Sequence, residues 1–250
     1  MATPFHLHGK TILVTGASSG IGQSVAVECS RMGATVVITG RDRERLLQTM
    51  AMMEGEDHAL VTADLSHFEE IERLANDCPK LDGVSHNAGI ANMVTVKHIT
   101  ADRLGLMMGT NALAPILLTQ QLLSRKRLNK NSSIVFTSSL SGIYCVHYGE
   151  SIYAASKGAV GGFAKGAALE LAAQGIRVNC VNPSIIRTPL FENEGGALSE
   201  EQMQEKIANY PLRRLGEPTD VSWAHVFLLS DASSWITGID LPVDGGYLLI

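Results

Sequence analysis

The sequence has little of several features that define other classes of protein. Four of its 250 residues are cysteine, and Cys29, Cys78, Cys145 and Cys180 form no C-x-x-C pair. They lie in apolar or helix-like segments, so we expect free thiols in a reducing compartment rather than a disulfide framework. The eight histidines form no ligand-spaced cluster with these cysteines. We therefore expect no metal site.

A surplus of positive charge and long apolar runs are also missing. The chain has 20 Lys and Arg against 25 Asp and Glu, a formal net charge of −5. This balance gives no electrostatic reason to expect nucleic acid or an anionic membrane as a partner. No uninterrupted apolar run approaches bilayer-spanning length, and MATPFHLHGK at the N-terminus lacks the apolar core of a signal peptide. We expect a cytoplasmic protein.

Hydrophobic residues are plentiful, at 45% of the chain, which is ample for a sizeable core. Short apolar runs alternate with helix-like segments along the sequence. The predicted strands are 10–15, 35–39, 58–62, 83–86, 133–137, 177–181 and 237–241, and the predicted helices are 23–32, 42–53, 66–76, 102–127, 151–173 and 218–230. Continuously apolar strands that alternate with helices predict an α/β fold, a doubly wound parallel sheet with helices on both faces.

No linker, repeat or low-complexity tract interrupts this alternation, so we expect a single domain over residues 1–250. The longest predicted irregular stretch is 183–198. It follows the carboxyl end of a strand, which is where open α/β sheets bind ligands. We expect a substrate loop around residues 183–212.

The first predicted strand runs directly into a glycine-rich turn, TGASSGIG at 15–22. Glycines allow a tight turn and a close approach of the backbone to a pyrophosphate, and the following helix offers free N–H groups at its positive end. Ser18 and Ser19 add hydroxyl donors. The spacing is G-x-x-x-G-x-G rather than G-x-G-x-x-G. Within a strand–turn–helix–strand unit, this turn predicts phosphate binding.

A second motif, SIYAASK at 151–157, opens a predicted helix. Tyr153 and Lys157 are four residues apart, so they lie on one helix face. A lysine ammonium beside a phenol favours the phenolate and lowers the pKa of the phenol, which makes it a proton donor and acceptor near neutral pH. Alone, the pair could be an ordinary tyrosine and lysine on a solvated face.

Taken together, the motifs resemble the short-chain dehydrogenase/reductase family, in the single-domain branch that includes 3-oxoacyl-carrier-protein reductases. The resemblance covers nearly the whole chain. It rests on TGASSGIG at 15–22, Asp64-Leu65, Asn87-Ala88-Gly89, Asn111, Ser139, Tyr153 with Lys157, VNPSIIRTPL at 181–190 and VDGG at 243–246. It implies a Rossmann-type fold and hydride transfer between a nicotinamide cofactor and a ketone or secondary alcohol.

The resemblance also implies four catalytic residues. Tyr153 would exchange a proton with the substrate oxygen, Lys157 would hold the nicotinamide ribose, and Ser139 would hydrogen-bond the substrate oxygen. Ser138 is the rival serine, but Ser139 with Gly142 matches the S-x-x-G pattern of the family. The main-chain carbonyl of Asn111 would hold a water linked to the lysine.

Proline at position 115 bears on that water. Pro115 has no N–H, so it cannot donate to the carbonyl of Asn111 four residues earlier, and its ring crowds that carbonyl. The freed oxygen suits a water relay to Lys157 and Tyr153. The alternative is that Pro115 only marks the first turn of a new helix.

The cofactor contacts implied by the resemblance follow the strand ends. Asp64 would contact the adenine beside Leu65, residues 87–89 would pass under the adenine ribose, and Pro183 with Ile186 and Thr188 would grip the nicotinamide amide. Asp64 could instead cap the helix predicted from Ser66 onward. Ser66 itself, with Glu69 three residues later, is the cap that we expect for this helix. The predicted set is Gly16, Ser18, Ser19, Gly20, Ile21, Gly22, Arg41, Asp64, Leu65, Asn87, Ala88, Gly89, Tyr153, Lys157, Pro183, Ile186 and Thr188.

The end of the second predicted strand bears on the choice of cofactor. NAD-binding relatives place an acid there to accept the ribose hydroxyls, but this chain has Gly40. Arg41 follows, and its guanidinium suits a 2′-phosphate. Asp42 lies about 20 residues past the glycine turn and could be the ribose acid, but we prefer it as a helix N-cap. We expect NADP(H) rather than NAD(H).

The substrate is expected to be a small carbonyl or alcohol compound in a mostly apolar site. The candidate lining residues are Ile90, Tyr144, Cys145, His147, Tyr148, Ile185, Leu190 and Phe191. The sequence leaves open a specific 3-oxoacyl-carrier-protein reductase, another alcohol or sugar oxidoreductase, or a dinucleotide-sensing protein without turnover.

Two predicted helices suggest an assembly. The segment 151–173 carries alanine and glycine on nearly every side, and 112–123 is similarly apolar. A helix that is apolar all round is normally buried all round. We expect a subunit interface here, and relatives in the family are commonly tetramers, so a homotetramer or homodimer is the expected state. A thick monomeric core is the alternative.

Overall fold

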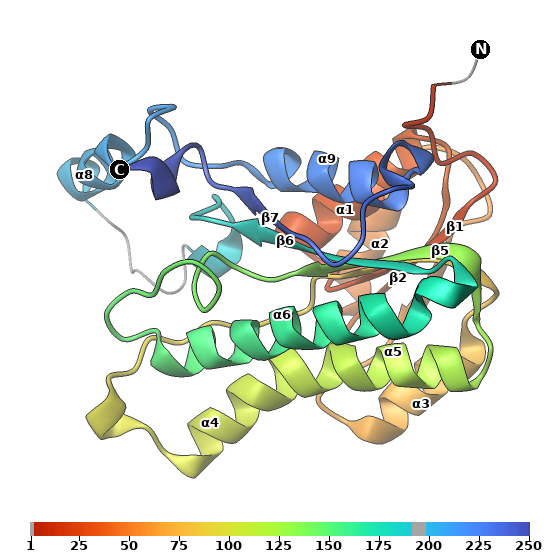
Figure 1. Cartoon of the computed structure of the whole chain (residues 1–250), viewed down its shortest axis with the longest axis horizontal. Helices are drawn as coiled ribbons and strands as arrows, with labels where there is room; N and C mark the ends of the chain where they lie inside the picture. The colour runs from red at the N-terminus through yellow and green to blue at the C-terminus, as the bar shows by residue number, and fades with distance from the viewer. Residues whose placement is uncertain (1–2, 192–198) are drawn as a thin grey trace.

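The computed structural model describes residues 3–191 and 199–250, in three layers with a parallel sheet between two sets of helices (Figure 1). The described strands form one seven-stranded sheet in the order β3-β2-β1-β4-β5-β6-β7. They are β1 (Thr11–Thr15), β2 (Thr35–Gly40), β3 (Ala59–Thr62), β4 (Leu81–His86), β5 (Leu128–Thr137), β6 (Arg177–Pro183) and β7 (Asp240–Val243). All the strand pairs are parallel. The predicted doubly wound α/β fold is confirmed.

Helices cover both faces of the sheet, as predicted (Figure 1). The described helices are α1 (Gly20–Arg31), α2 (Arg43–Met52), α3 (Phe68–Asp77), α4 (Ala101–Met108), α5 (Ala114–Ser124), α6 (Ser151–Leu171), α8 (Glu200–Ala208) and α9 (Pro218–Leu229). Of these, α8 lies beside the C-terminus rather than over the sheet (Figure 1). Neighbouring strand residues supply two separate cores. Leu13 packs in the core under α3, α5 and α6, whereas Ile12 and Val14 pack in the core under α1 and α9. Burial on both faces explains why the strands are continuously apolar.

Helix α8 is one of the described elements that periodicity did not predict. Its sequence is mostly polar and it has no fully buried residue, so the apolar repeat that marks other helices is weak here. The signal that could have found it is a capping box. Ser199 Oγ accepts from the Gln202 N–H at 3.2 Å, and the Gln202 side chain accepts from the Ser199 N–H at 3.0 Å. Part of the predicted irregular stretch, 192–198, lies outside the described residues.

The predicted cap of α3 is wrong. Helix α3 starts at Phe68 with His67 as its N-cap residue, not at Ser66. The Ser66 hydroxyl and N–H both donate to Asp64 Oδ1, at 2.7 and 2.9 Å, and this local turn delays the helix. Asp42, by contrast, is the N-cap that we predicted for α2, because its Oδ1 accepts from the Arg45 N–H at 3.1 Å.

The long helix predicted over 102–127 contains a π-helical turn. Residues Gly109–Leu113 form this turn between α4 and α5, and Asn111 lies inside it. Pro115 occupies one of the first two positions of α5, but α5 continues directly from the π turn, because Leu113 and Ala114 both have helical φ and ψ angles. Both interpretations of Pro115, as the first turn of a new helix and as the residue that frees a carbonyl for the water relay, therefore stay predictions.

Other expectations concern cysteines, metals and membranes. All four cysteines are free, and burial raises the pKa of the Cys78 and Cys180 thiols to about 12. Across residues 3–191 and 199–250, no three His, Cys, Asp or Glu side chains are grouped to hold a metal ion. Over the same ranges, no helix combines the length and apolarity needed to cross a membrane.

Candidate active site

The predicted cofactor residues gather at one edge of the sheet. Gly16 follows β1, Arg41 follows β2, Asp64 comes shortly after β3, and Asn87 follows β4. Parallel strands place their carboxyl ends at the same edge. The strand order reverses at β1, which lies between β2 and β4. This reversal point is where open α/β sheets bind their ligands.

The glycine turn is packed against the segment that follows β4. Gly16 has φ +65°, and a Cβ atom there would lie 2.7 Å from the Ala88 backbone nitrogen. A Cβ at Gly22 would lie 2.3 Å from the Gly16 carbonyl oxygen. The Thr15 hydroxyl accepts from the N–H groups of Asn87 and Ala88, at 3.0 and 3.2 Å. A side chain at Gly16 would push the turn away from the segment after β4, and one at Gly22 would push α1 away from the turn.

Helix α1 starts inside the turn, at Gly20. The first N–H groups of a helix have no partner within it, and they carry the positive end of the helix dipole. The turn, the close glycine contacts and this helix end together fit a phosphate-bearing dinucleotide. Gly20 also lies against the predicted nicotinamide segment, because a Cβ there would be 3.2 Å from Thr188 Cγ2.

The end of β2 is open and is followed directly by an arginine. Gly40 ends the strand, and a Cβ at this position would make only ordinary contacts, 3.5 Å from Leu46 and Ser18. The exposed Arg41 lies near Asp64. Burial acts to raise the pKa of the Asp64 carboxyl, but hydrogen bonds from Ser66 and the charges of Arg41 and His67 outweigh it, so this pKa lies below its usual range.

Tyr153 and Lys157 lie on the same face of α6, at the carboxyl ends of β4 and β5. Lys157 is buried, and its Nζ donates to the Thr137 carbonyl oxygen at 2.9 Å. The same Nζ is 5.7 Å from the centre of the Tyr153 ring. Burial lowers the pKa of Lys157 to about 8, against a weaker opposing effect of Cys180. This lysine therefore changes charge close to neutral pH.

The two candidate serines follow β5 and differ in their surroundings. Ser138 is buried, and its hydroxyl donates to the Lys157 carbonyl oxygen at 3.2 Å. Ser139 is half-buried, and its Oγ accepts from the Ser141 N–H at 3.1 Å. Of the two hydroxyls, the one at Ser139 is the more open to a ligand. Gly142, the glycine of the pattern, has φ +89°, and a Cβ there would meet the Ala154 carbonyl oxygen of α6 at 2.1 Å.

Asn111 lies behind the site and does not face into it. Its Oδ1 accepts from the Ile90 N–H and its Nδ2 donates to the Ile90 carbonyl oxygen, both at 2.8 Å. The amide also donates to Ser156 Oγ at 3.1 Å. The side chain thus fixes the segment after β4 to α6, which leaves the main-chain carbonyl as the group for the predicted water contact.

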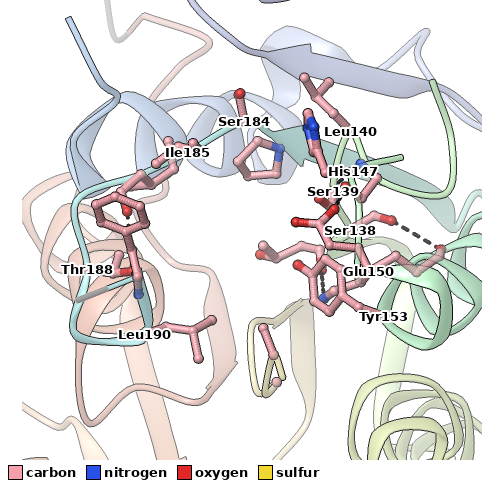
Figure 2. Close-up of a pocket in the computed structure, with 18 of the residues that line it drawn as sticks. Ser138, Ser139, Leu140, His147, Glu150, Tyr153, Ser184, Ile185, Thr188 and Leu190 are labelled. Atoms are coloured by element: carbon pink, nitrogen blue, oxygen red, sulfur yellow. Dashed lines mark hydrogen bonds between the residues drawn. The ribbon is translucent and has the colours of Figure 1, made fainter. Parts of the chain in front are cut away.

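These elements enclose a cavity of about 450 Å³. Figure 2 shows Ser138, Ser139, Glu150 and Tyr153 on one side and Ile185, Thr188 and Leu190 across from them. The predicted cofactor residues that line it are Ile21, Asn87, Gly89, Tyr153, Lys157, Pro183, Ile186 and Thr188. The remaining members of the predicted set lie outside it, along the ends of β1, β2, β3 and β4.

The predicted substrate lining is partly right. Ile90, His147, Ile185, Leu190 and Phe191 line the cavity. Three other candidates do not. The Tyr144 hydroxyl donates to the Asp240 carbonyl oxygen at 2.8 Å, Tyr148 is 86% exposed, and Cys145 is also outside the cavity.

Several lining residues were missed, and most of them are polar. The polar ones are Asn92, Thr137, Ser141, Glu150, Ser184, Lys206, Asn209, Tyr210 and Tyr247, and the apolar ones are Ala91, Met93 and Leu140. Glu150 lies three residues before Tyr153, and its Oε2 accepts a hydrogen bond from Ser141 Oγ at 2.5 Å. Glu150 precedes the Y-x-x-x-K helix in sequence, which was the available signal. The residues of α8 and of the C-terminal segment have no such signal, because only the fold brings them to the cavity.

A parallel sheet with a glycine-rich turn at its reversal point is the architecture of dinucleotide-binding proteins. The chain matches the family model described as enoyl-(acyl carrier protein) reductase over residues 16–248. It is 32% identical to 3-oxoacyl-(acyl-carrier-protein) reductase of Rickettsia felis, over 98% of this chain and 99% of that protein. It is 35% identical to a tropinone reductase homolog of Arabidopsis thaliana, over 96% of this chain and 91% of that protein.

Solved structures agree with these relatives. A short chain dehydrogenase/reductase family protein matches with a TM-score of 0.87 at 33% identity, over 98% of this chain and 100% of that one. A second structure, from Beutenbergia cavernae, matches with a TM-score of 0.90 at 30% identity, over 99% of this chain and 100% of that one. It is provisionally assigned as an NAD(P)-dependent gluconate 5-dehydrogenase and has NADP bound at low occupancy. The chain belongs to the short-chain dehydrogenase/reductase family of oxidoreductases, which bind a nicotinamide dinucleotide.

Proposed function

We propose that this chain, as one domain over residues 1–250, is an NADP-dependent oxidoreductase that interconverts a ketone and a secondary alcohol. One observation supports this most: Tyr153, Lys157 and Ser139 line a single cavity at the sheet edge that carries the glycine turn. The nicotinamide cofactor, when bound, supplies or accepts the hydride. The chain itself must bind the substrate oxygen and move one proton.

In this proposal, the Tyr153 hydroxyl gives its proton to the substrate oxygen during reduction and takes it back during oxidation. The developing phenolate is stabilised by the Lys157 ammonium beside it. Ser139 donates its hydroxyl proton to the same substrate oxygen and so polarises the carbonyl. Lys157 also holds the nicotinamide ribose, and Asn111 positions the lysine through a water on its main-chain carbonyl.

The proposed cofactor contacts are those predicted from the sequence, with Gly16 to Gly22 around the phosphates and Thr188 at the nicotinamide. The preference for NADP(H) is supported by Arg41 beside a position without a side chain, Gly40. Arg41→Ala should weaken NADPH binding about tenfold or more, since a hydrogen bond to a charged group contributes roughly 1.5–3 kcal/mol. NADH binding should hardly change. Equal losses for both cofactors, measured by fluorescence titration, would contradict this role.

The experiment that tests the function is a panel of ketones and secondary alcohols, followed by NADPH absorbance, with Tyr153→Phe as the paired variant. Phenylalanine keeps the ring and removes the proton donor. It should retain NADPH binding and lose most turnover, because positioned acid–base groups contribute about 10²–10⁴-fold. Retention of more than about a tenth of the rate would show that another group transfers the proton.

A 3-oxoacyl-carrier-protein reductase is the narrower candidate, and the Rickettsia relative favours it. The polar lining at Glu150, Asn209 and Tyr247 favours a smaller, hydroxylated substrate instead. Including a 3-oxoacyl thioester and polyols in the panel separates the two. A protein that binds NADPH and turns over nothing would be the dinucleotide-sensing alternative.

We also propose a homotetramer or homodimer. In the single chain α6 is not buried all round: Gly162 and Gly166 are exposed, a Cβ at either would meet nothing within 4 Å, and Leu169 is 82% exposed. Leu113, in the π turn next to α5, is also exposed. This open strip of small and apolar residues supports a helix-to-helix contact with a second copy.

A further inference from the structure

A buried histidine on α9 is hydrogen-bonded to residues at the ends of two strands. His225 has no exposed surface. Its Nδ1 is 2.8 Å from Ser85 Oγ on β4, and its Nε2 is 3.0 Å from Thr137 Oγ1 on β5. Both of these residues also bond to Asn87, whose Nδ2 donates to Ser85 Oγ at 2.9 Å and whose Oδ1 accepts from Thr137 at 2.6 Å. The four side chains form a closed ring of hydrogen bonds.

The donors and acceptors of this ring can be assigned from chemistry. Asn87 Nδ2 also donates to the Ser85 carbonyl oxygen at 3.1 Å, which fixes the orientation of the amide. Thr137 donates its one hydroxyl proton to Asn87 Oδ1. In its bond with His225, Thr137 can therefore only accept, so His225 Nε2 must carry a proton and donate it. His225 Nδ1 is then the acceptor, and Ser85 donates to it. Every bond in the ring runs in the same direction, and the imidazole is neutral.

The ring reaches from the core to the cavity. Ser85 and His225 are fully buried, whereas Asn87 and Thr137 both line the cavity. Thr137 has a second role, because its main-chain carbonyl accepts from Lys157 Nζ at 2.9 Å. A buried polar side chain costs free energy unless it is hydrogen-bonded, and apolar side chains could fill the same space without that cost. A fully satisfied network does, however, hold its members in one arrangement.

We propose that His225 is a positioning residue for the cofactor site, which holds the Asn87 and Thr137 side chains, and thereby the acceptor of Lys157, in a single orientation. This inference rests on the proposed function. It means that α9, a helix that otherwise packs against α1 and the sheet, also supports the cofactor site from behind.

The chain contains a matched control. His86 is the residue next to Ser85, is also buried, and bonds through its Nε2 to Thr119 Oγ1 at 3.0 Å. Its ring stacks on Phe136, on the opposite face of the sheet, so its partners are Thr119 and Phe136 rather than the four side chains of the hydrogen-bonded ring. His86→Leu and His225→Leu therefore remove the same type of buried group, and only the second opens the ring.

The experiment compares these two variants by urea unfolding, by NADPH fluorescence titration and by turnover. Both should be less stable than wild type. His225→Leu should raise the Kd for NADPH about tenfold, the equivalent of one lost hydrogen bond, and lower kcat. His86→Leu should leave both quantities within about twofold of wild type, because its bonds do not reach the site. Equal effects of the two variants on NADPH binding would overturn the proposal.

Two further measurements keep the test decisive if His225→Leu does not fold. Ser85→Ala removes the partner of Nδ1 and should also raise the Kd for NADPH, and nitrogen NMR of wild type should show His225 with its proton on Nε2. A proton on Nδ1, or an unchanged Kd in Ser85→Ala, would overturn the proposal. Failure of wild type to bind NADPH would instead refute the proposed function.

Discussion

His86 and His225 should make the fold sensitive to mild acid. Burial lowers the pKa of each imidazole to about 3, from an ordinary value of 6.5. The surroundings explain why neither ring takes a proton. His86 is bonded to a threonine hydroxyl and stacked on Phe136, and His225 is bonded to two hydroxyls.

The sign and the size follow from proton binding. Below about pH 6.5 the unfolded chain protonates both histidines and the folded chain does not, so acid favours unfolding. The stabilising contribution is fully present above pH 6.5 and is lost as the pH falls towards 3. At pH 5 each histidine lies about 1.5 pH units below its unfolded pKa, so the loss is about 2 kcal/mol per residue and about 4 kcal/mol for both. Typical domains have 5–15 kcal/mol in total.

The assay is urea unfolding at pH 7.5 and at pH 5.0, for wild type and for the double variant His86→Leu/His225→Leu. Wild type should lose about 4 kcal/mol of unfolding free energy between these conditions, and the double variant should lose far less. The carboxyls of Asp64 and Asp220 have pKa values below 3.8, so their contribution is lost mainly below pH 5. A wild-type loss under about 1 kcal/mol would refute the reasoning.

Three other predictions concern the site and the assembly. Because burial lowers the pKa of Lys157 to about 8, its charge is present below that pH and lost above it, so kcat/KM for reduction should fall as the pH rises through about 8; a flat profile there would contradict the role. Light scattering at micromolar concentration should report a tetramer or dimer, which Leu169→Asp weakens, and a wild-type monomer would reject the interface. Pro115→Ala restores an N–H that can occupy the Asn111 carbonyl, so turnover should drop; unchanged turnover across pH would leave the proline a structural role only.

The sequence predicted those parts of the fold and site that depend on short stretches of chain. Each of the described strands overlaps a predicted apolar run. A strand that is buried on both faces is apolar along its whole length, so it can be recognised from its own residues alone. The N-cap at Asp42 was also predictable, because its capping hydrogen bond joins residues only three positions apart in the chain. Motif order then placed Tyr153, Lys157 and Ser139 in one site, and the structure brings all three to one cavity.

What the sequence could not predict depends on residues far apart in the chain or on competition between local bonds. The ring at His225 joins residues 140 positions apart, and nothing near His225 in sequence indicates Ser85. The cavity contacts of Tyr210 and Tyr247 likewise come only from the fold. At Ser66 the expected cap failed because its hydroxyl bonds back to Asp64 instead of forward to the helix.

The π turn at Gly109–Leu113 limits how this chain can change in length. A π turn takes in one residue more than an α-helical turn, and each residue of an α-helix rotates the next by about 100°. Loss of one residue here would convert the turn to ordinary helix and swing α4 round relative to α5. Met107 would leave its buried position, and the Asn111 side chain would lose its hydrogen bonds to the Ile90 backbone. Single-residue deletions should therefore be selected against in this helix and tolerated in surface loops such as 54–57.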